Sequence, residues 1–151
     1  TSKKFITLSI ISDNQVSKQI KDLIKFNELE IKIYEKVSNL KTRFMGDCDV
    51  VFSVGYLKKI ETEIINNFEI INLHPSLLPK YKGLMTHKRM LINNEIKYGY
   101  SIHKVTRYLD DGEILSQNQK KVSTSSETEL ITDHKQLEHQ KVFKDLVNFL
   151  N

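Results

Sequence analysis

The sequence predicts an α/β fold: one domain in which a mostly parallel sheet is flanked by helices. Short apolar runs alternate along the chain with segments whose apolar residues recur at helical spacing, as in sheets built from strand–helix–strand units. A length of 151 residues suits one domain with one core. Hydrophobic residues make up 39% and charged residues 28%, which is typical of a globular protein. We therefore treat residues 1–151 as a single domain.

The amino-terminal third contains three predicted strands and one predicted helix. Residues 5–11 form an apolar run that ends in Ser-Asp-Asn, a pattern typical of a strand followed by a helix cap. Apolar residues then recur at helical spacing over residues 16–26. Residues 29–34 alternate between apolar and charged, and residues 48–54 form a second apolar run, so both segments are expected to be strands.

The rest of the chain continues the alternation of helices and strands. A helix is expected over residues 61–68, a strand over 70–73 and a second helix over 86–91. A strand over 99–105 then leads into a turn over 108–112, and residues 113–117 form the start of another strand. Ser126-Glu-Thr-Glu129 is a capping box that opens the last helix. The apolar positions of that helix are Leu130, Leu137, Val142, Leu146, Val147 and Leu150.

Charge and cysteine content argue against several classes of function. The net charge of +4 comes from lysines spread along the chain, whereas a nucleic-acid surface needs clustered basic residues. No run approaches the ~18 apolar residues of a membrane span, and we expect no signal peptide. Cys48 is the only cysteine, which excludes an internal disulfide and a cysteine-based zinc site, and we expect it to be a small buried hydrophobe. These features predict a cytoplasmic protein without a nucleic-acid or membrane partner.

The end of the 70–73 strand carries a suggestive polar pair. Asn72 and His74 alternate, so their side chains project to the same side of a strand, and Pro75 holds His74 in an extended conformation. An imidazole beside a carboxamide can stabilise the negative charge that develops when a carbonyl is attacked. In α/β sheets ligands bind at the carboxyl ends of the strands, where the loops at 55–59 and 72–75 are both expected.

Asp110, in the turn after the 99–105 strand, is a candidate for the carboxylate that such a histidine needs. No Gly-x-Ser-x-Gly motif accompanies the pair, which favours direct attack by a substrate amine. The residues alone also allow a purely structural interpretation. The proline-rich loop could be a rigid surface turn in which His74 is hydrogen-bonded, and Asp110 could belong to an ordinary turn. The spacing of the other histidines, His87, His103, His134 and His139, fits no standard metal site. We interpret His103 as a half-buried strand residue.

Two motifs in these stretches resemble those of a known family, the formyltransferases that use 10-formyltetrahydrofolate. The first is Asn72-Leu-His-Pro-Ser-Leu-Leu-Pro79, followed by Lys-Tyr-x-Gly-Leu-x-Thr-His87. The second runs from Ser101 to Gly112 and contains Leu-Asp-x-Gly. Residues 49–60 are similar to the strand and loop that line the family's folate pocket. The resemblance is strongest to the members that formylate glycinamide ribonucleotide in purine biosynthesis.

The resemblance implies a Rossmann-like formyltransferase domain and a role for each matched residue. Asn72 and His74 would polarise the formyl oxygen and stabilise the oxyanion, while Asp110 would hold His74 and assist proton transfer from the amine. The formyl donor would be held by Tyr56, Leu57, Lys58, Lys59, Ile60 and Leu109. The amine substrate would contact Pro75, Gly83 and Glu138, and Glu138 would bind the ribose hydroxyls. Without the resemblance, a glutamate at position 138 indicates only an exposed polar position on a helix.

The resemblance covers about residues 48–149 and weakens in the shorter amino-terminal part. Where the family's purine enzyme has a Gly- and Ser-rich phosphate loop, this chain has Ser12-Asp-Asn14, whose carboxylate opposes phosphate binding. Amino-sugar nucleotide formyltransferases begin in a similar way and are the alternative. A folate-binding protein without catalysis is a third hypothesis. The sequence leaves the oligomeric state open, and a homodimer is one option.

Overall fold

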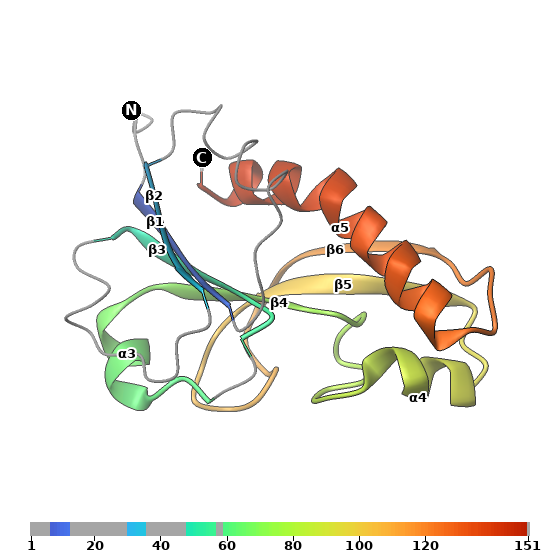
Figure 1. Cartoon of the computed structure of the whole chain (residues 1–151). Helices are drawn as coiled ribbons and strands as arrows, with labels where there is room; N and C mark the ends of the chain where they lie inside the picture. Colours follow the sequence, from blue (N-terminus) through green and yellow to red (C-terminus); the bar gives the residue numbers. More distant parts are fainter. Residues whose placement is uncertain (1–6, 13–29, 36–47, 57–58, 151) are drawn as a thin grey trace.

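The structure, a computed structural model, describes residues 7–12, 30–35, 48–56 and 59–150 (Figure 1). The helix predicted over residues 16–26 and two of the expected donor-binding residues, Leu57 and Lys58, lie outside the described residues. Within the described part of the chain, no helix has the length and apolar character needed to cross a membrane.

A six-stranded sheet with the order β2-β1-β3-β4-β5-β6 forms the centre of the described structure (Figure 1). Its strands are β1 (Thr7–Ser12), β2 (Glu30–Glu35), β3 (Val50–Val54), β4 (Ile70–His74), β5 (Lys97–Lys104) and β6 (Ile114–Lys121). The first four strands in this order pair in parallel, whereas β5 pairs antiparallel with both β4 and β6. The prediction of a mostly parallel sheet is confirmed for these four strands, and β5 and β6 add an antiparallel hairpin at one edge.

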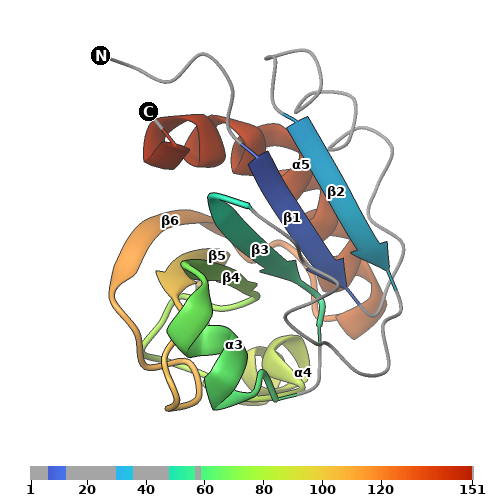
Figure 2. The ribbon, with the colours of Figure 1, turned by 90° about the vertical axis from the view of Figure 1, so that its left-hand side faces the viewer.

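Three described helices cover the sheet: α3 (Thr62–Asn67), α4 (Thr86–Ile92) and α5 (Glu127–Leu150). Alternate residues of β3 enter two different cores, because successive side chains of a strand point to opposite faces. Val50 and Phe52 join the larger core with residues of α4 and α5, while Val51 packs with Ile64 of α3 in the smaller one. Accordingly, α3 and α5 lie on opposite sides of the sheet (Figures 1 and 2). Cys48 packs against the smaller core but is only half-buried, so the expectation of a small buried hydrophobe is met in part.

The long helix α5 supplies much of the larger core. The predicted burial of its apolar face is confirmed for Leu130, Leu137, Val142 and Leu146. At its start the Ser126 hydroxyl accepts a hydrogen bond from the backbone N–H of Glu129 (3.3 Å), which is one half of the capping box. The other half differs from the prediction: the Glu129 carboxylate accepts from the Thr124 hydroxyl (2.6 Å), which in turn accepts from the Ser126 N–H (3.0 Å).

Strand register brings residues from distant parts of the sequence together at the end of β4. Asn72 lies beside Ser53 of β3 on one side and His103 of β5 on the other. His74 pairs with Ser101 of β5. The central position of β4 therefore places Asn72 and His74 where the loops after β3, β4 and β5 meet.

Candidate active site

The proline-rich loop after β4 is anchored to the sheet by a buried hydroxyl. Ser101 Oγ accepts hydrogen bonds from the backbone N–H of Leu78 (2.9 Å) and from Gln117 Nε2 (2.9 Å), and donates to the carbonyl of Ser76 (2.7 Å). The Ser76 hydroxyl is itself buried and donates to the carbonyl of Lys80 (2.6 Å). Because both hydroxyls bond to the loop backbone, they hold its shape, and Ser76 is not poised as a nucleophile.

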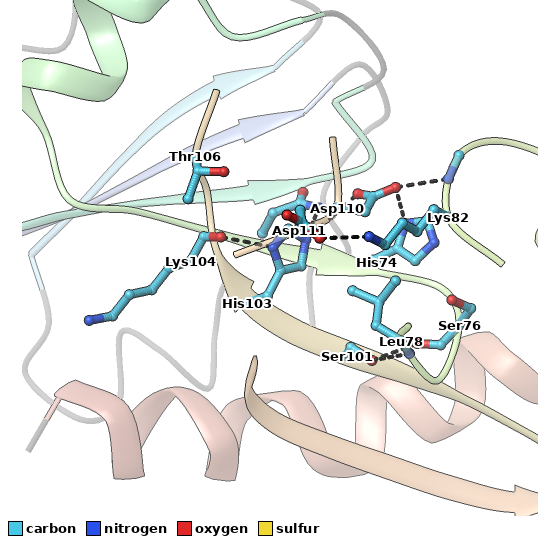
Figure 3. A network of polar contacts seen from close by, with 12 residues as sticks. His74, Ser76, Leu78, Lys82, Ser101, His103, Lys104, Thr106, Asp110 and Asp111 are labelled. Atoms are coloured by element: carbon cyan, nitrogen blue, oxygen red, sulfur yellow. Dashed lines mark hydrogen bonds and ion pairs between the residues drawn. The ribbon is translucent and has the colours of Figure 1, made fainter. Parts of the chain in front are cut away.

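His74 is buried at the point where this loop folds back on the strand. Its Nε2–H donates to the carbonyl of Tyr81 at 2.7 Å, so the hydrogen of the neutral ring lies on Nε2. Its Nδ1 lies 3.5 Å from Asp110 Oδ2 (Figure 3). Burial lowers the pKa of His74 below its ordinary value, although the Tyr81 carbonyl and the Asp110 carboxylate act in the opposite direction. The predicted convergence of His74 and Asp110 is therefore present in the structure.

Asp110 joins the loop after β4 to the loop after β5. It is only 9% exposed and has the left-handed backbone conformation, with φ of 50°. Its Oδ2 accepts from the backbone N–H of Gly83 at 2.8 Å, and its Oδ1 lies 3.7 Å from His103 Nε2. Next to it, Asp111 Oδ1 accepts from Lys82 Nζ at 2.7 Å, which ties the same two loops together at the surface (Figure 3).

His103 is a member of the site that sequence reasoning missed. The interpretation as a half-buried strand residue was wrong, because the side chain is buried and its Nε2 faces the site. His103 Nδ1–H donates to the carbonyl of Lys104 (2.9 Å), so Nε2 of the neutral ring accepts from the Asn72 amide (3.2 Å). The signal that could have found it was the pairing of β4 with β5, which sets Asn72 opposite His103.

A cavity of about 1300 Å³ opens beside these residues. Asn72, His74, His103 and Asp110 share one part of its wall. Among the expected donor-binding residues that the structure describes, the lining includes Tyr56, Lys59, Ile60 and Leu109. The apolar side chains of Val54 and Val105 complete that end. Such a wall suits a flat ring system with polar edges.

The other end of the cavity lies between α4 and α5 and includes the residues expected to contact the amine. Pro75, Gly83 and Glu138 all line the cavity. The N–H of Gly83 is already donated to Asp110, so this residue shapes the loop rather than offering a free donor. Glu138 is not the exposed helix residue that its type alone indicates, since its side chain is 16% exposed and lies 2.6 Å from His134 Nε2.

His87 and His134 lie together near this end of the cavity. Their ring centroids are 4.7 Å apart in an edge-on arrangement. Burial, with a smaller contribution from the neighbouring histidines, lowers the pKa of His87 to about 4, so its ring is neutral at pH 7. Among the described residues, no group of three or more His, Cys, Asp and Glu side chains has a geometry that could hold a metal ion.

Comparison with known proteins finds formyltransferases among both the family models and the relatives. A family model described as formyl transferase matches residues 13–147. Phosphoribosylglycinamide formyltransferase from Escherichia coli (strain K12) is 31% identical over 103 residues, which is 67% of this chain and 49% of that protein. The chain therefore spans about half the length of this relative.

Two solved structures have a similar fold. The sugar N-formyltransferase from Shewanella sp FDAARGOS_354 matches with a TM-score of 0.79 at 20% identity, over 96% of this chain and 70% of that one. HypX from Aquifex aeolicus, solved in complex with tetrahydrofolic acid, matches with a TM-score of 0.82 at 14% identity, over 95% of this chain and 26% of that one.

Proposed function

The chain belongs to the formyl transferase family, and from this premise we propose that it transfers a formyl group from 10-formyltetrahydrofolate to the primary amine of a small molecule. The observation that carries the proposal is the convergence of Asn72, His74 and Asp110 on one wall of a cavity of about 1300 Å³. The hydroxyl of Ser76, two residues after His74, is bonded to loop carbonyls and does not line the cavity. Direct attack by the amine therefore fits the site better than a covalent enzyme intermediate.

The donor fits the end of the cavity formed by the loops after β3 and β5. Ile60, Val105 and Leu109 provide apolar walls for its ring system, and Tyr56 contributes an aromatic surface. Lys59 and Arg107 are exposed and also line the cavity, where they suit the carboxylates of the donor's glutamate tail. When bound, the donor supplies the formyl group to be transferred.

His74 and Asp110 are placed to handle the proton that the attacking amine loses. With its hydrogen on Nε2, neutral His74 presents the Nδ1 lone pair 3.5 Å from the Asp110 carboxylate, and a proton between them is stabilised by both groups. Once protonated, Nδ1–H can donate to the formyl oxygen as negative charge develops there. Asn72 gives one amide hydrogen to His103 and keeps the second for the same oxygen.

Glycinamide ribonucleotide is the acceptor we favour. The Leu84-x-Thr86-His87 motif and Glu138 match the members that use it, and the relative from Escherichia coli carries that activity in its name. An amino-sugar nucleotide is the second candidate, because Ser12-Asp-Asn14 replaces a glycine-rich phosphate loop and the fold resembles a sugar N-formyltransferase.

An acceptor assay tests the proposal. Purified protein is given 10-formyltetrahydrofolate with either glycinamide ribonucleotide or a panel of amino-sugar nucleotides, and release of tetrahydrofolate is followed spectroscopically. We expect release with one acceptor class and none without acceptor. Release with neither class, together with measurable donor binding, would favour the third hypothesis of a folate-binding protein without catalysis.

A further inference from the structure

His134, a buried residue of α5, contacts the carboxylate of Glu138 behind the wall of the cavity. Its side chain is 3% exposed, and its Nε2 lies 2.6 Å from Glu138 Oε2, one helical turn further along. Glu138 belongs to the cavity lining, and His134 does not. His134 therefore reaches the cavity only through Glu138.

The imidazole of His134 is held in place from other elements. His87 of α4 packs edge-on against it at 4.7 Å, and the rings of Tyr98 and Tyr100 in β5 lie at 6.4 Å. His87 is neutral at pH 7, so it brings no positive charge next to Glu138. Packing on these sides leaves the ring little freedom to turn away from the carboxylate.

The contact with Glu138 is the main polar interaction open to the His134 ring. Nε2 faces the Glu138 carboxylate at 2.6 Å, although the two groups are not aligned well enough to form a hydrogen bond. Nδ1 is buried and has no hydrogen-bond partner among the described residues. Burying a polar ring costs free energy unless polar groups lie against it, and the Glu138 carboxylate is the polar group that the described structure places closest to the His134 ring.

Fixing one carboxylate oxygen orders Glu138 before a ligand arrives. A glutamate on a helix surface samples several rotamers, and ordering it in advance reduces the entropy lost on binding. In the described part of the chain, Oε1 of Glu138 has no hydrogen-bond or ion-pair partner, so this oxygen is available to accept from a ligand.

We propose that His134 is a positioning residue that presents the Glu138 carboxylate to hydroxyl groups of the acceptor. This end of the cavity then recognises an amine that carries neighbouring hydroxyls, as a sugar ring does, because a carboxylate accepts two such hydrogens well. The inference rests on the proposed function, since it concerns the acceptor of the same reaction.

The test compares variants that remove or keep the donor at position 134. His134→Phe keeps a flat ring without an N–H, and His134→Gln keeps an N–H that can reach the carboxylate. The exposed Gln136→Ala on the same helix is the matched control. Acceptor and donor KM, kcat, and calorimetric affinity for glycinamide ribonucleotide and for an amino-sugar nucleotide are measured for each variant, with thermal unfolding to confirm that the variants fold.

The expected result is selective for the acceptor. His134→Phe raises the KM and Kd of the acceptor about tenfold, a loss typical of one polar contact, while kcat and the donor KM change less than about twofold. His134→Gln restores acceptor binding to within about threefold of the original, and adding Glu138→Gln to His134→Phe weakens it no further than Glu138→Gln alone.

Other outcomes overturn the inference or the proposed function separately. Unchanged acceptor binding in His134→Phe, equal losses for donor and acceptor, or additive effects in the double variant would overturn the role of His134 while leaving formyl transfer intact. Weaker acceptor binding in His134→Phe without turnover by the original protein would overturn the proposed function alone. Binding of neither acceptor would overturn both.

Discussion

At the scale of single residues, burial favours the neutral form of two histidines that line the cavity, His74 and His87. His74 and His87 are both removed from water, which disfavours the charged ring and lowers both pKa values. For His74 this matters to the chemistry, because a neutral ring offers a lone pair beside Asp110 that can take a proton from an amine. The proposed proton transfer therefore requires the negative charge of the Asp110 carboxylate, which an amide of the same shape lacks.

Asp110→Asn tests this dependence. The amide keeps an oxygen for the Gly83 N–H but removes the charge that stabilises a proton on His74, so we expect kcat to fall about 100-fold or more. Donor affinity should stay within about twofold, because the substitution leaves the apolar walls intact. Stopped-flow turnover and calorimetric titration of the donor measure the two quantities, and an unchanged kcat would refute the role of Asp110.

The lowered pKa of His87 makes the free energy of unfolding depend on pH. Its pKa is about 4 in the folded protein and near 6.5 when unfolded, so between these values only the unfolded chain takes up the proton. The free energy of unfolding should therefore be intact above pH 6.5 and fall by roughly 3 kcal/mol as the pH drops towards 4, with His74 acting in the same direction.

Urea unfolding at pH 7, 6 and 5 measures this dependence. In His87→Phe the loss of stability between pH 7 and 5 should be clearly smaller than in the original chain. Equal slopes for the two proteins would mean that His87 is charged when folded.

At the scale of elements, the site depends on how strands pair and how loops close. The alternation of Asn72 and His74 was enough to predict that both side chains line one cavity. His103 was missed because its place opposite Asn72 is set by the antiparallel pairing of β4 with β5, which no local pattern specifies. The bond from the Gly83 N–H to Asp110 was missed for a similar reason, since it requires a left-handed turn at Asp110 and a loop closing on it from 27 residues away.

Two glycines near Asp110 give a matched test of the turn. A Cβ on Gly112 would lie 1.7 Å from the Lys104 carbonyl oxygen, so Gly112→Ala must displace the turn. We expect it to lower the free energy of unfolding by about 2–4 kcal/mol and to reduce kcat through Asp110. Gly83 has φ of +85° with open space around it, so Gly83→Ala should cost only about 1 kcal/mol of backbone strain. Denaturant unfolding of both variants measures the difference, and equal losses would contradict the crowding at Gly112.

At the scale of the whole molecule, the sheet places the proposed donor and acceptor regions on either side of the residues at the end of β4. The cavity runs from the loop after β3, past the end of β4, to α5. The periodicity of the chain predicted the strands and helices that build this arrangement, including the buried face of α5. It could not predict the antiparallel hairpin of β5 and β6, because the direction of neighbouring strands depends on how connections cross the sheet.

Detection of the formylated amine is the decisive test of formyl transfer at Asp110 and His74. The protein and its Asp110→Asn variant are each incubated with 10-formyltetrahydrofolate and glycinamide ribonucleotide, or with an amino-sugar nucleotide, and the acceptor is analysed by mass spectrometry. We expect one acceptor to gain the mass of a single formyl group in place of an amine hydrogen, and the variant to make this product about 100-fold or more slowly. Release of tetrahydrofolate while every acceptor keeps its original mass would mean that the formyl group goes to water, and would contradict the account.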